Sequence, residues 1–476
     1  MLVGHVVGNA IIPPSIDKRE LGGPILTRRG NWGSRVGFVL AAAGSAIGLG
    51  NIWKFPYITG VNGGGAFVLI YLLCIALVGL PVMIAEILLG RAAQRSPVGA
   101  FKHFSSSHKG WACFGWLGVL ASFVILSYYS IVAGWALHYT YLSITGQIVG
   151  LGPDGVGSAF QELFVSSELN LLWHLLFMLM TIGVVIGGVG KGLERWARIL
   201  MPVLFVLMII LLVNSFTLDG FQRAFDFVFG FHTDQLSAGG VLEALGHAFF
   251  TLSLGMGAML TYGSYLRSHD DIISSSLMIS ILDTVIALTA ALILFPIIFT
   301  FNLEPGAGPG LVFVSIPIAL SQLPGGSVLS LIFFSLLVFA ALTSAISILE
   351  VTTSYFIDER GWARSRATLV AGGIIAVVGV PSALSGGTVL FGSGFSEIFG
   401  RNWFDTFDYL ATNWMLPLGG LGIALFTAWR LDDGIRHREL LAGSKLIFFY
   451  KSWLLLLKFL VPVGISLVFL HAVGMI

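Results

Sequence analysis

Charged residues are scarce in this chain of 476 residues, and their scarcity limits what kind of protein it can be. Asp, Glu, Lys and Arg make up 10% of the sequence and apolar residues make up 56%, whereas charged residues are about 25% of an ordinary soluble domain. So few charges cannot cover the surface of a water-soluble protein of this length. The composition therefore excludes a soluble or disordered chain and indicates that most of the protein lies in a lipid bilayer.

Cysteine, net charge and several recognition motifs are also missing or nearly so. The two cysteines, Cys74 and Cys113, cannot form the framework of a disulfide-rich secreted domain. A formal net charge of +1 provides no basic surface, so no nucleic-acid partner is expected. No GxSxG, HExxH or Cys/His metal spacing is present, and we expect no enzyme. The absence of an Asn-x-Ser/Thr glycosylation acceptor favours a prokaryotic cell membrane.

Apolar runs of about 20 residues or more recur along the chain without the alternation of barrel strands. Because lipid cannot hydrogen-bond a bare backbone, each run is predicted to be a transmembrane helix. Eleven helices are predicted, at 36–59, 65–90, 112–144, 170–189, 193–214, 241–266, 272–301, 327–357, 367–391, 407–429 and 446–473. A further apolar run, 311–323, is too short to cross and contains Pro317, so we expect a surface or re-entrant helical hairpin there.

Lysine and arginine are distributed unequally between the two faces of this predicted bundle. Nearly all of them lie in the N-terminal leader or in the connections after helices 2, 4, 6, 8 and 10, while the opposite face has only Arg223 and Arg401. Because cytoplasmic loops are enriched in these residues, we expect the N-terminus to be cytoplasmic and the C-terminus extracytoplasmic. Together with the missing glycosylation acceptor, this predicts a multi-pass protein of a prokaryotic inner membrane.

Glycines interrupt two of the predicted helices at a similar depth. The first helix reads GSAIGLGNIWKFP, in which Gly44, Gly48 and Gly50 weaken the helix. The sixth reads HAFFTLSLGMGAM and contains Gly255 and Gly257. Glycines in membrane helices also permit close packing, and this alternative stays open for either segment alone. Two such segments at matching positions are typical of discontinuous helices in inverted repeats, which point to a binding site near the middle of the bilayer.

Four segments resemble the neurotransmitter:sodium symporter family, which has the leucine-transporter fold. They read NWGSRVGFVLAAAGSAIGLGNIWKFPYITGVNGGGAF, FFTLSLGMGAMLTYGSY, PGLVFVSIPIALSQLPGG and FAALTSAISIL, and the resemblance runs from about Arg29 to the end of helix 10. Met256 and the eleven helices are most similar to bacterial multihydrophobic amino-acid transporters. The resemblance implies a sodium-coupled secondary active symporter that imports hydrophobic amino acids by alternating access. A non-transporting amino-acid sensor on the same scaffold is the alternative.

The resemblance also implies how the chain is divided. Residues 1–34 would be a cytoplasmic N-terminal segment, and 35–430 a transport core of two five-helix repeats, about 35–214 and 241–430. Residues 431–476 would contain a cytoplasmic loop and helix 11. An odd number of helices in each repeat makes the second repeat enter the membrane with inverted topology. The expected fold class is therefore all-α integral membrane, with eleven helices, a 5+5 inverted repeat, and breaks in helices 1 and 6.

Two sodium sites follow from the resemblance. The first would use the substrate carboxylate with Ala46, Asn51, Thr251 and Asp283. The second would use Gly44, Ile47, Ala340, Thr343 and Ser344. The residues alone leave alternatives, because Asp283 could be protonated or paired structurally, and the hydroxyls of helix 8 could bond to the preceding turn. An oxygen shared by substrate and ion would make the affinity of each depend on the other.

The substrate implied by the resemblance is a hydrophobic L-amino acid. Unwound backbone in helix 1 and the Tyr129 hydroxyl would bind its carboxylate, carbonyls of helix 6 would accept from its ammonium, and apolar residues would surround its side chain. The expected set is Ala46, Gly48, Leu49, Gly50, Ile125, Tyr129, Phe250, Thr251, Ser253, Met256, Ser344 and Ile348. A flexible thioether at Met256, where many relatives have an aromatic residue, suggests tolerance of several bulky apolar side chains.

Charged pairs resemble the gates of the family at both ends of this path. On the outside, Lys54 and Asp408 resemble an ion pair that closes above Phe250 and Tyr129. The family has arginine at the lysine position, and lysine cannot form a bidentate fork, so this gate would be looser. On the inside, the matching residues are Arg29, Asp358, Trp32 and Tyr265.

Three further positions carry expectations. Chloride-dependent relatives have a serine where this chain has Ala287, and Asp283 would supply the negative charge that chloride brings elsewhere. We therefore expect no chloride requirement. His247 replaces the usual glutamine and could be either a packing residue or a source of pH sensitivity between about pH 5 and 8. Glu86 is expected to hydrogen-bond the broken part of helix 6.

Overall fold

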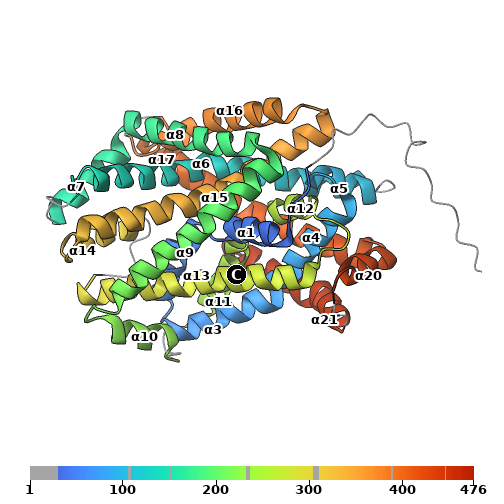
Figure 1. The fold of residues 1–476 in the computed structure, drawn as a ribbon, viewed down its shortest axis with the longest axis horizontal. Helices are drawn as coiled ribbons and strands as arrows, with labels where there is room; N and C mark the ends of the chain where they lie inside the picture. Colours follow the sequence, from blue (N-terminus) through green and yellow to red (C-terminus); the bar gives the residue numbers. More distant parts are fainter. Residues whose placement is uncertain are drawn as a thin grey trace, which may run out of the picture.

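The protein is described by a computed structural model at residues 30–105, 109–148, 153–231, 236–303, 310–387, 390–444, 446 and 448–475. Within these ranges the regular secondary structure is helical and no strand occurs. Most of the long helices run along the long axis of the molecule and form one bundle (Figure 1). Helices satisfy their own backbone hydrogen bonds, so this all-helical bundle is the arrangement that the long apolar runs predict.

Nine helices in the described ranges are long and apolar enough to cross a membrane. Five of them are single helices: α6 (Ala112–Ile144), α8 (Ser167–Ile186), α13 (Ile272–Thr300), α15 (Gly326–Arg360) and α16 (Arg364–Ala383). Two more are Gly65–Ala93, which contains α3 (Gly65–Cys74) and α4 (Leu80–Ala93), and Val189–Ser215, which ends in α9 (Arg195–Ser215). The last two are Trp403–Arg430, with α18 (Trp403–Tyr409) and α19 (Leu416–Leu425), and Phe449–Ala472, with α21 (Phe449–Leu455) and α22 (Val461–Ala472). A tenth span is a bent pair of helices, Arg35–Ala46 (α1) and Gly50–Val61 (ending in α2, Phe55–Val61).

The first predicted break is present in the structure. Helix α1 ends at Ala46, and Ile47 has an extended backbone with ψ of 93°. The chain then continues as the π-helical stretch Gly50–Lys54 and α2, and the two halves of the pair are bent by 52°. Helix 1 is therefore discontinuous, as its glycines predict.

The second predicted break divides helix 6 into α11 (Ala238–Thr251) and α12 (Ala258–Gly263). Between them, Ser253, Gly255 and Gly257 have positive φ values of 53°, 82° and 77°. Neither half has the roughly 20 residues that a membrane crossing needs. The presence of the break is confirmed, while the total of eleven transmembrane helices stays a prediction.

Shorter helices connect the long ones. They are α5 (Pro97–Phe104), α7 (Pro153–Val165), α10 (Phe221–Phe229), α14 (Ile316–Ser321), α17 (Ser393–Phe399) and α20 (Asp433–Leu441). The run predicted to be too short to cross is a short apolar helix, Leu311–Ser321. The helix predicted at 367–391 ends earlier, at Ala383, because the chain turns and packs Gly386 too closely against the Phe164 carbonyl for any larger side chain.

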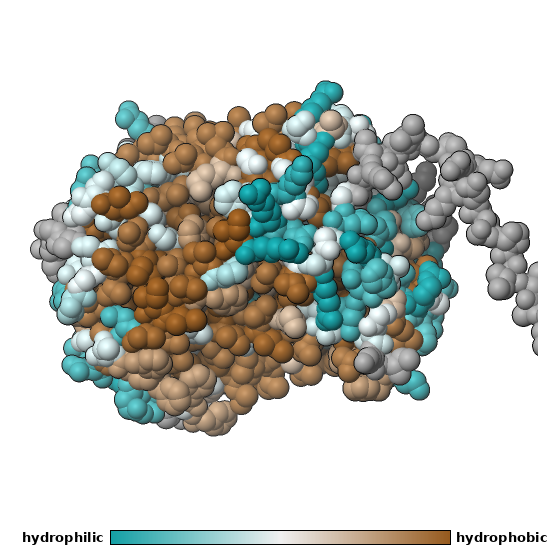
Figure 2. All heavy atoms as spheres, in the orientation of Figure 1, coloured by the Kyte–Doolittle hydropathy of each residue, from teal (hydrophilic) through white to brown (hydrophobic). Residues whose placement is uncertain are grey.

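The surface of the bundle has the apolar character that a lipid-facing protein requires. In Figure 2, hydrophobic residues cover a broad area of this face, while hydrophilic residues lie along its left edge and in a patch that extends from the middle of the view toward the right. Large exposed apolar side chains on α8 and α9 include Leu179, Val206, Ile209 and Val213. In water such a surface would drive association, whereas in a bilayer it contacts lipid.

Candidate functional site

The two interrupted helices meet around a small cavity of about 30 Å³. The break after α1, the break after α11, and helices α6 and α15 surround it. Every residue predicted to bind substrate lines this cavity, together with Ser45, which the sequence did not single out. The lining residues are Ser45, Ala46, Gly48, Leu49, Gly50, Ile125, Tyr129, Phe250, Thr251, Ser253, Met256, Ser344 and Ile348. Segments far apart in the sequence are thus brought to one place, and the binding role of these residues stays a prediction.

Backbone at the break of helix 1 lies close to polar side chains of α6 and α15. The Leu49 N–H donates to the Tyr129 hydroxyl oxygen over 3.4 Å. A Cβ atom added to Gly48 would lie 2.7 Å from Ser344 Oγ and 3.3 Å from the Tyr129 hydroxyl oxygen. Only glycine permits so close an approach. The break therefore presents main-chain N–H groups beside a tyrosine hydroxyl, an arrangement suited to an anionic group.

Two hydrogen bonds hold the break of helix 6 in position. The Ser253 hydroxyl donates to the Ser45 carbonyl of helix 1 over 2.8 Å, and Glu86 Oε1 accepts from the Gly255 N–H over 2.7 Å. The expectation that Glu86 bonds the broken part of helix 6 is confirmed. These contacts join the two breaks to each other and to α4.

Asp283 lies on α13 and is fully buried beside both breaks. Its Oδ1 atom accepts from Asn51 Nδ2 over 2.7 Å and from the Thr251 hydroxyl over 3.0 Å. No lysine, arginine or histidine forms an ion pair with it in the part of the chain that the structure describes. The predicted side chains of the first sodium site are therefore adjacent, and Ala46 lines the neighbouring cavity. A buried carboxylate with only neutral partners is a suitable place for a cation.

The residues of the second predicted sodium site lie where α1 contacts α15. The Thr343 hydroxyl donates to the carbonyls of Phe339 and Ala340 in its own helix, each over 3.0 Å, which is the local bonding that the residue types alone allow. The Ser344 hydroxyl instead donates across to the Ser45 carbonyl of helix 1 over 3.0 Å. The other predicted ligands, Gly44 and Ile47, are buried on the helix 1 side.

The residues predicted for the outer gate line a second cavity, of about 190 Å³, which adjoins the first. Lys54, Asp408, Tyr129 and Phe250 are all among its lining residues. Lys54 and Asp408 do not form an ion pair within 4.0 Å. Lys54 Nζ instead lies 4.6 Å from the centroid of the Phe250 ring, and Asp408 accepts a hydrogen bond from the Thr412 hydroxyl over 3.2 Å. Here the predicted partners face one cavity without pairing directly.

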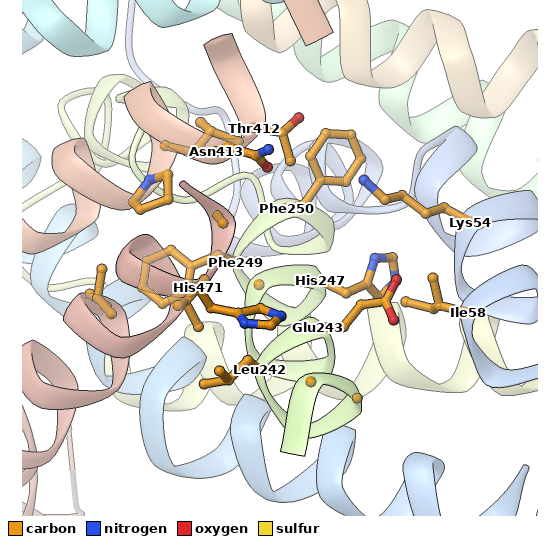
Figure 3. A pocket seen from close by; sticks show the side chains of 18 of the residues that line it. Lys54, Ile58, Leu242, Glu243, His247, Phe249, Phe250, Thr412, Asn413 and His471 are labelled. Atoms are coloured by element: carbon orange, nitrogen blue, oxygen red, sulfur yellow. The ribbon is translucent and has the colours of Figure 1, made fainter. Parts of the chain in front are cut away.

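A third and larger cavity, of about 490 Å³, lies between α11, α19 and α22. Glu243 and His247 project from α11 toward helix 1 in it (Figure 3). Glu243 accepts from Asn62 Nδ2 over 2.8 Å, and the ring of His247 packs against those of Phe55 and Tyr71 with centroids 5.9 Å and 5.6 Å away. These contacts support the packing role for His247, and its pH sensitivity stays a prediction.

Only part of the predicted inner gate can be described. Arg29 lies outside the described residues. The Trp32 N–H donates to the Tyr265 carbonyl over 3.2 Å, and the two rings pack edge to face with centroids 6.3 Å apart. Asp358 Oδ2 accepts from the Ser96 N–H over 2.5 Å. Trp32 and Tyr265 are therefore packed closely at the N-terminal end of helix 1, and the gate itself stays a prediction.

The structure adds a buried ion pair to this end of the molecule that the sequence did not identify. Arg364 donates to both oxygens of Glu350, over 2.7 Å and 2.8 Å, and to the Val185 carbonyl over 3.1 Å. The Tyr265 hydroxyl donates to the same carboxylate over 2.5 Å. The network joins α15, α16, α8 and the chain just after α12. A lone glutamate in the apolar stretch 327–357 was the available signal, since such residues need a partner.

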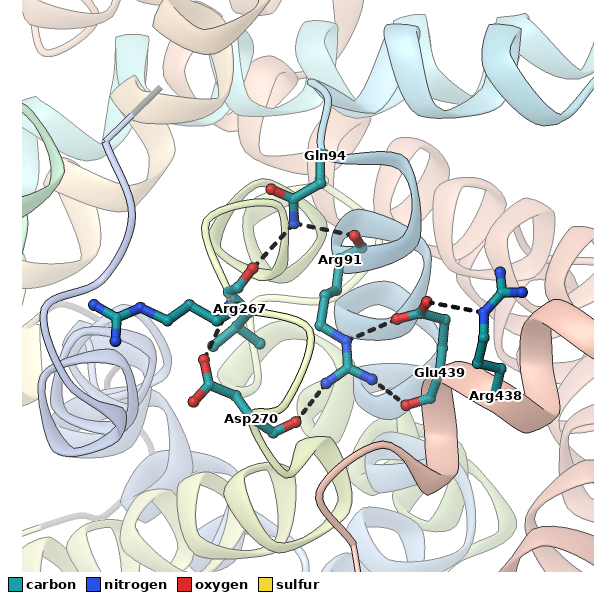
Figure 4. Close-up of polar contacts among 7 residues, drawn as sticks. Arg91, Gln94, Arg267, Asp270, Arg438 and Glu439 are labelled. Carbon is teal, nitrogen blue, oxygen red and sulfur yellow. Dashed lines mark hydrogen bonds and ion pairs between the residues drawn. The ribbon is translucent and has the colours of Figure 1, made fainter. Parts of the chain in front are cut away.

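A second polar cluster lies at the C-terminal end of α4 (Figure 4). Arg91 Nε donates to Glu439 Oε2 over 2.9 Å, and the same guanidinium contacts the carbonyls of Asp270 and Glu439. Gln94 Nε2 donates to the Leu266 carbonyl over 3.0 Å. The cluster fastens α20 and the loop after α12 to the end of α4.

A family model and two curated relatives all indicate a sodium-dependent transporter. The profile described as "Sodium:neurotransmitter symporter family" matches residues 29–150 and 163–473. The uncharacterized sodium-dependent transporter YhdH of Bacillus subtilis is 38% identical over 447 residues, which cover 94% of this chain and 98% of that protein. An uncharacterized sodium-dependent transporter of Haemophilus influenzae is 33% identical, over 93% of this chain and 98% of its own length.

The fold is also shared with a solved structure. MhsT, crystallised in complex with L-phenylalanine, superimposes with a TM-score of 0.85 and 43% identity, covering 94% of this chain and 100% of that one. The fold class is therefore the leucine-transporter fold, as the sequence motifs predict.

Proposed function

The chain belongs to the sodium:neurotransmitter symporter family, whose members are secondary transporters and not enzymes, and we propose that it imports hydrophobic L-amino acids by alternating access. Membership establishes a multi-pass, sodium-dependent transporter. The class of amino acid, two sodium ions in each cycle, independence from chloride and the orientation in the membrane belong to the proposal.

The observation that carries the proposal is the position of Asp283. Its carboxylate is fully buried at the contact of both broken helices, where Asn51 and Thr251 are its hydrogen-bond partners. A sodium ion at this point would gain hard oxygen ligands and offset the buried charge. Ala46 and Thr251 line the substrate cavity as well, so a substrate carboxylate could complete the coordination of the ion. Such a shared contact would couple the binding of the two.

A hydrophobic amino acid is favoured by the side chains around the cavity. Ile125, Phe250, Met256 and Ile348 provide apolar and adaptable surface, while the helix 1 break provides N–H groups. MhsT, at 43% identity, was crystallised with L-phenylalanine. We therefore propose that the substrate carboxylate binds the helix 1 break beside Tyr129, and that its side chain lies against these four residues.

Chloride independence follows from where the negative charge lies. In the proposed first sodium site, Asp283 provides that charge itself, and Ala287, one turn further along α13, has no hydroxyl to bind an anion. Sodium and substrate would then bind without a halide. A chloride requirement for uptake by the unmodified protein would contradict this part of the proposal.

The second sodium ion would connect α1 to α15. We propose that the carbonyls of Gly44, Ile47 and Ala340 and the hydroxyls of Thr343 and Ser344 provide its ligands. Because the Thr343 hydroxyl now bonds within its own helix, binding would require only a rotation of that side chain. Loss of this ion would weaken the contact of α1 with α15 and so favour opening toward the cytoplasm.

The gates would control access from either side of this centre. Lys54 and Asp408 would draw together over the outer cavity, above Phe250 and Tyr129, and Asp358 would pair with Arg29 over Trp32 and Tyr265. The proposed orientation places residues 1–34 in the cytoplasm and the C-terminus outside. The proposed core is 35–430, with repeats of about 35–214 and 241–430, followed by 431–476.

A competition binding panel of amino acids, measured with purified protein in sodium and again in potassium, tests this proposal. Leucine, isoleucine, valine, methionine, phenylalanine and tryptophan are expected to bind in sodium and to lose most of their affinity in potassium. Glutamate, lysine and glycine serve as the polar and small controls. Equal affinity in both salts, or preference for a charged amino acid, would overturn it.

Uptake into proteoliposomes separates a symporter from a sensor. A symporter accumulates labelled substrate only when a sodium gradient is imposed, and accumulation collapses when the gradient is dissipated by an ionophore. A sensor on the same scaffold would bind in sodium and accumulate nothing. Repeating the uptake with gluconate in place of chloride tests the halide independence in the same preparation.

A further inference from the structure

A short helix near one end of the molecule carries a row of exposed phenylalanines. Helix α10 follows the membrane span that ends in α9 and lies toward the same end of the molecule as α7 and α14 (Figure 1). Phe225 and Phe229 are 44% and 48% exposed. Their ring centroids lie 4.9 Å apart, and the Phe221 ring continues the row 6.5 Å from that of Phe225. Such an apolar surface is costly in water and indicates a surface that another apolar phase covers.

Helix α10 has three distinct faces. The buried face contains Ala224 and Val228. The aromatic face contains the phenylalanines at positions 221, 225 and 229, which share one side of the helix because they are four residues apart. The polar face contains Gln222, Arg223 and Asp226, all of them exposed. An apolar stripe beside a polar one is typical of helices that lie in the plane of a membrane surface.

Contacts along the buried face fix α10 to α13 and α3. The Gly220 N–H, just before α10, donates to the Thr300 hydroxyl at the end of α13 over 2.9 Å. The Phe227 ring packs against that of Phe295 with centroids 4.9 Å apart. The first turn of α3 lies so close that a Cβ atom on Gly65 would overlap the carbonyl oxygen of the residue after α10. These contacts prevent α10 from turning its aromatic face inward.

The aromatic face continues the lipid-facing surface of the preceding span. Ile209, Val213 and Phe216 are exposed on one side of α9 and its C-terminal cap, and the Phe216 ring lies 4.7 Å from that of Phe221. The span Val189–Ser215 has 27 residues and is about 40 Å long at 1.5 Å per residue. Since a hydrocarbon core is about 30 Å thick, Phe216 lies near its boundary. The bilayer that covers α9 therefore reaches α10.

We propose that α10 lies in the headgroup region of the membrane and inserts Phe225 and Phe229 into the edge of the hydrocarbon core, with Gln222 and Asp226 turned to water. The partner of this surface is phospholipid. Because α10 is fixed to α13 and α3, it would hold the ends of these two helices at a set depth in the bilayer. In the orientation proposed above this is the outer leaflet, and only that detail rests on the proposed function.

Spin labelling in phospholipid nanodiscs tests the proposal, in a Cys74→Ala/Cys113→Ser background. Labels are attached to Phe225→Cys on the aromatic face and to Gln222→Cys on the polar face of the same helix. Collisions of each label with oxygen, which concentrates in lipid, are compared with collisions with a nickel chelate, which stays in water. The ratio of oxygen to nickel collisions should be several-fold higher for Phe225→Cys than for Gln222→Cys.

Two further labels provide the references. Ile209→Cys, on the lipid-facing side of α9, gives the ratio expected inside the hydrocarbon core, and Asp226→Cys should resemble Gln222→Cys. Equal access of the nickel chelate to Phe225→Cys and Gln222→Cys would overturn the proposal, because the aromatic face would then be in water. Shielding of Phe225→Cys from both reagents would also overturn it, because a second copy or another protein would then cover this face.

Hydrogen–deuterium exchange of Phe225→Ser in the same nanodiscs provides a second test without a label. Removing one ring from lipid should make the amides of 221–229 exchange about tenfold faster, while peptides from α6 and α15 stay unchanged. Phe225→Trp, whose ring favours the membrane interface, should keep the protection of the unmodified protein. The matched control is Gln222→Ser, which places the same side chain on the polar face.

Exchange in Phe225→Ser that is no faster than in Gln222→Ser would contradict the anchoring role, as would equal exchange in Phe225→Trp and Phe225→Ser. Neither labelling nor exchange requires transport or sodium. The contact of α10 with lipid can therefore be confirmed even if the proposed transport function fails, and it can fail while that function stands.

Discussion

Asp283 is the side chain whose removal should separate sodium coupling from general stability. In Asp283→Asn the two hydrogen-bonding neighbours, Asn51 and Thr251, keep an oxygen partner, but the negative charge is lost. We expect sodium-dependent binding of phenylalanine to weaken at least about tenfold, since hydrogen bonds and contacts to a charged group contribute about 1.5–3 kcal/mol. Equilibrium binding in a sodium titration measures this.

The control for Asp283→Asn is Asp226→Asn on α10, where the carboxylate bonds an exposed Gln222 side chain over 3.1 Å. This change should leave the sodium titration unaltered. Adding chloride to Asp283→Asn is expected to restore little, because Ala287 offers no hydroxyl. Unchanged binding by Asp283→Asn without chloride would remove the basis of the proposed first sodium site.

Glu350 illustrates the cost of leaving a buried charge without its partner. Arg364→Gln would remove both guanidinium bonds from a fully buried carboxylate. We expect a loss of about 3–5 kcal/mol in the free energy of unfolding, visible as a marked fall in the apparent melting temperature of the detergent-solubilised protein.

Two comparisons make the Arg364→Gln result specific. The double variant Glu350→Gln/Arg364→Gln should recover part of the loss, because no charge then stays buried alone. Lys102→Gln, at the ion pair with Glu359 in which the lysine is half-exposed, should cost about 1 kcal/mol or less. Equal melting temperatures for Arg364→Gln and Lys102→Gln would show that the buried network contributes no more to stability than the ion pair of Lys102.

At the scale of elements, the break of helix 6 should tolerate no side chain at Gly255. Its φ is 82°, and a Cβ there would overlap the Leu416 carbonyl of α19. Gly255→Ala is expected to cost about 1–3 kcal/mol of strain and to weaken phenylalanine binding in sodium, which isothermal titration measures. In Gly373→Ala, where a Cβ meets nothing within 4 Å, we expect unchanged binding. Wild-type affinity in Gly255→Ala would contradict the need for this break.

The elements show what the sequence could and could not reveal. The breaks were predictable because Gly44, Gly48, Gly255 and Gly257 leave a local signature in two apolar runs. The early end of α16 was not, because it depends on the packing of Gly386 against α7. The π-helical stretches, such as Gly50–Lys54, also leave no clear composition signal.

Side-chain partners were likewise predictable where a motif indicates them, and not where they depend on the packing of distant helices. The side chains around Asp283 were expected together from the motifs, and the structure places them side by side, while their role as sodium ligands stays a prediction. The pair of Glu350 with Arg364 was missed because it requires knowing which helices touch. Lys54 was expected to pair with Asp408, but its ammonium lies over the Phe250 ring. A flexible lysine side chain can bind either an aromatic face or a carboxylate.

For the whole molecule, the unmodified cysteines can report the orientation. Helix α6 has 33 residues and is about 50 Å long at 1.5 Å per residue, so its ends extend beyond a hydrocarbon core of about 30 Å. Cys113 is exposed near its first turn, on the face expected to be cytoplasmic. A membrane-impermeant maleimide should label it in inside-out vesicles and not in right-side-out ones.

The matched variant for the labelling experiment is Cys113→Ser/Glu397→Cys, which moves the thiol to exposed α17 on the opposite face. Its labelling should have the reverse pattern. Cys74 is half-buried within the second transmembrane helix and should react in neither preparation. Labelling of Cys113 in right-side-out vesicles would invert the proposed topology.

The uncompensated charge of Asp283 has a consequence for handling the protein. Any ion that binds only the folded state stabilises it by mass action, and at 100 times its dissociation constant the gain is about 2.7 kcal/mol. The sodium content of an extraction or storage buffer should therefore set the shelf life of the purified transporter. Exchange into choline or potassium salts would weaken the folded protein before any substrate is added.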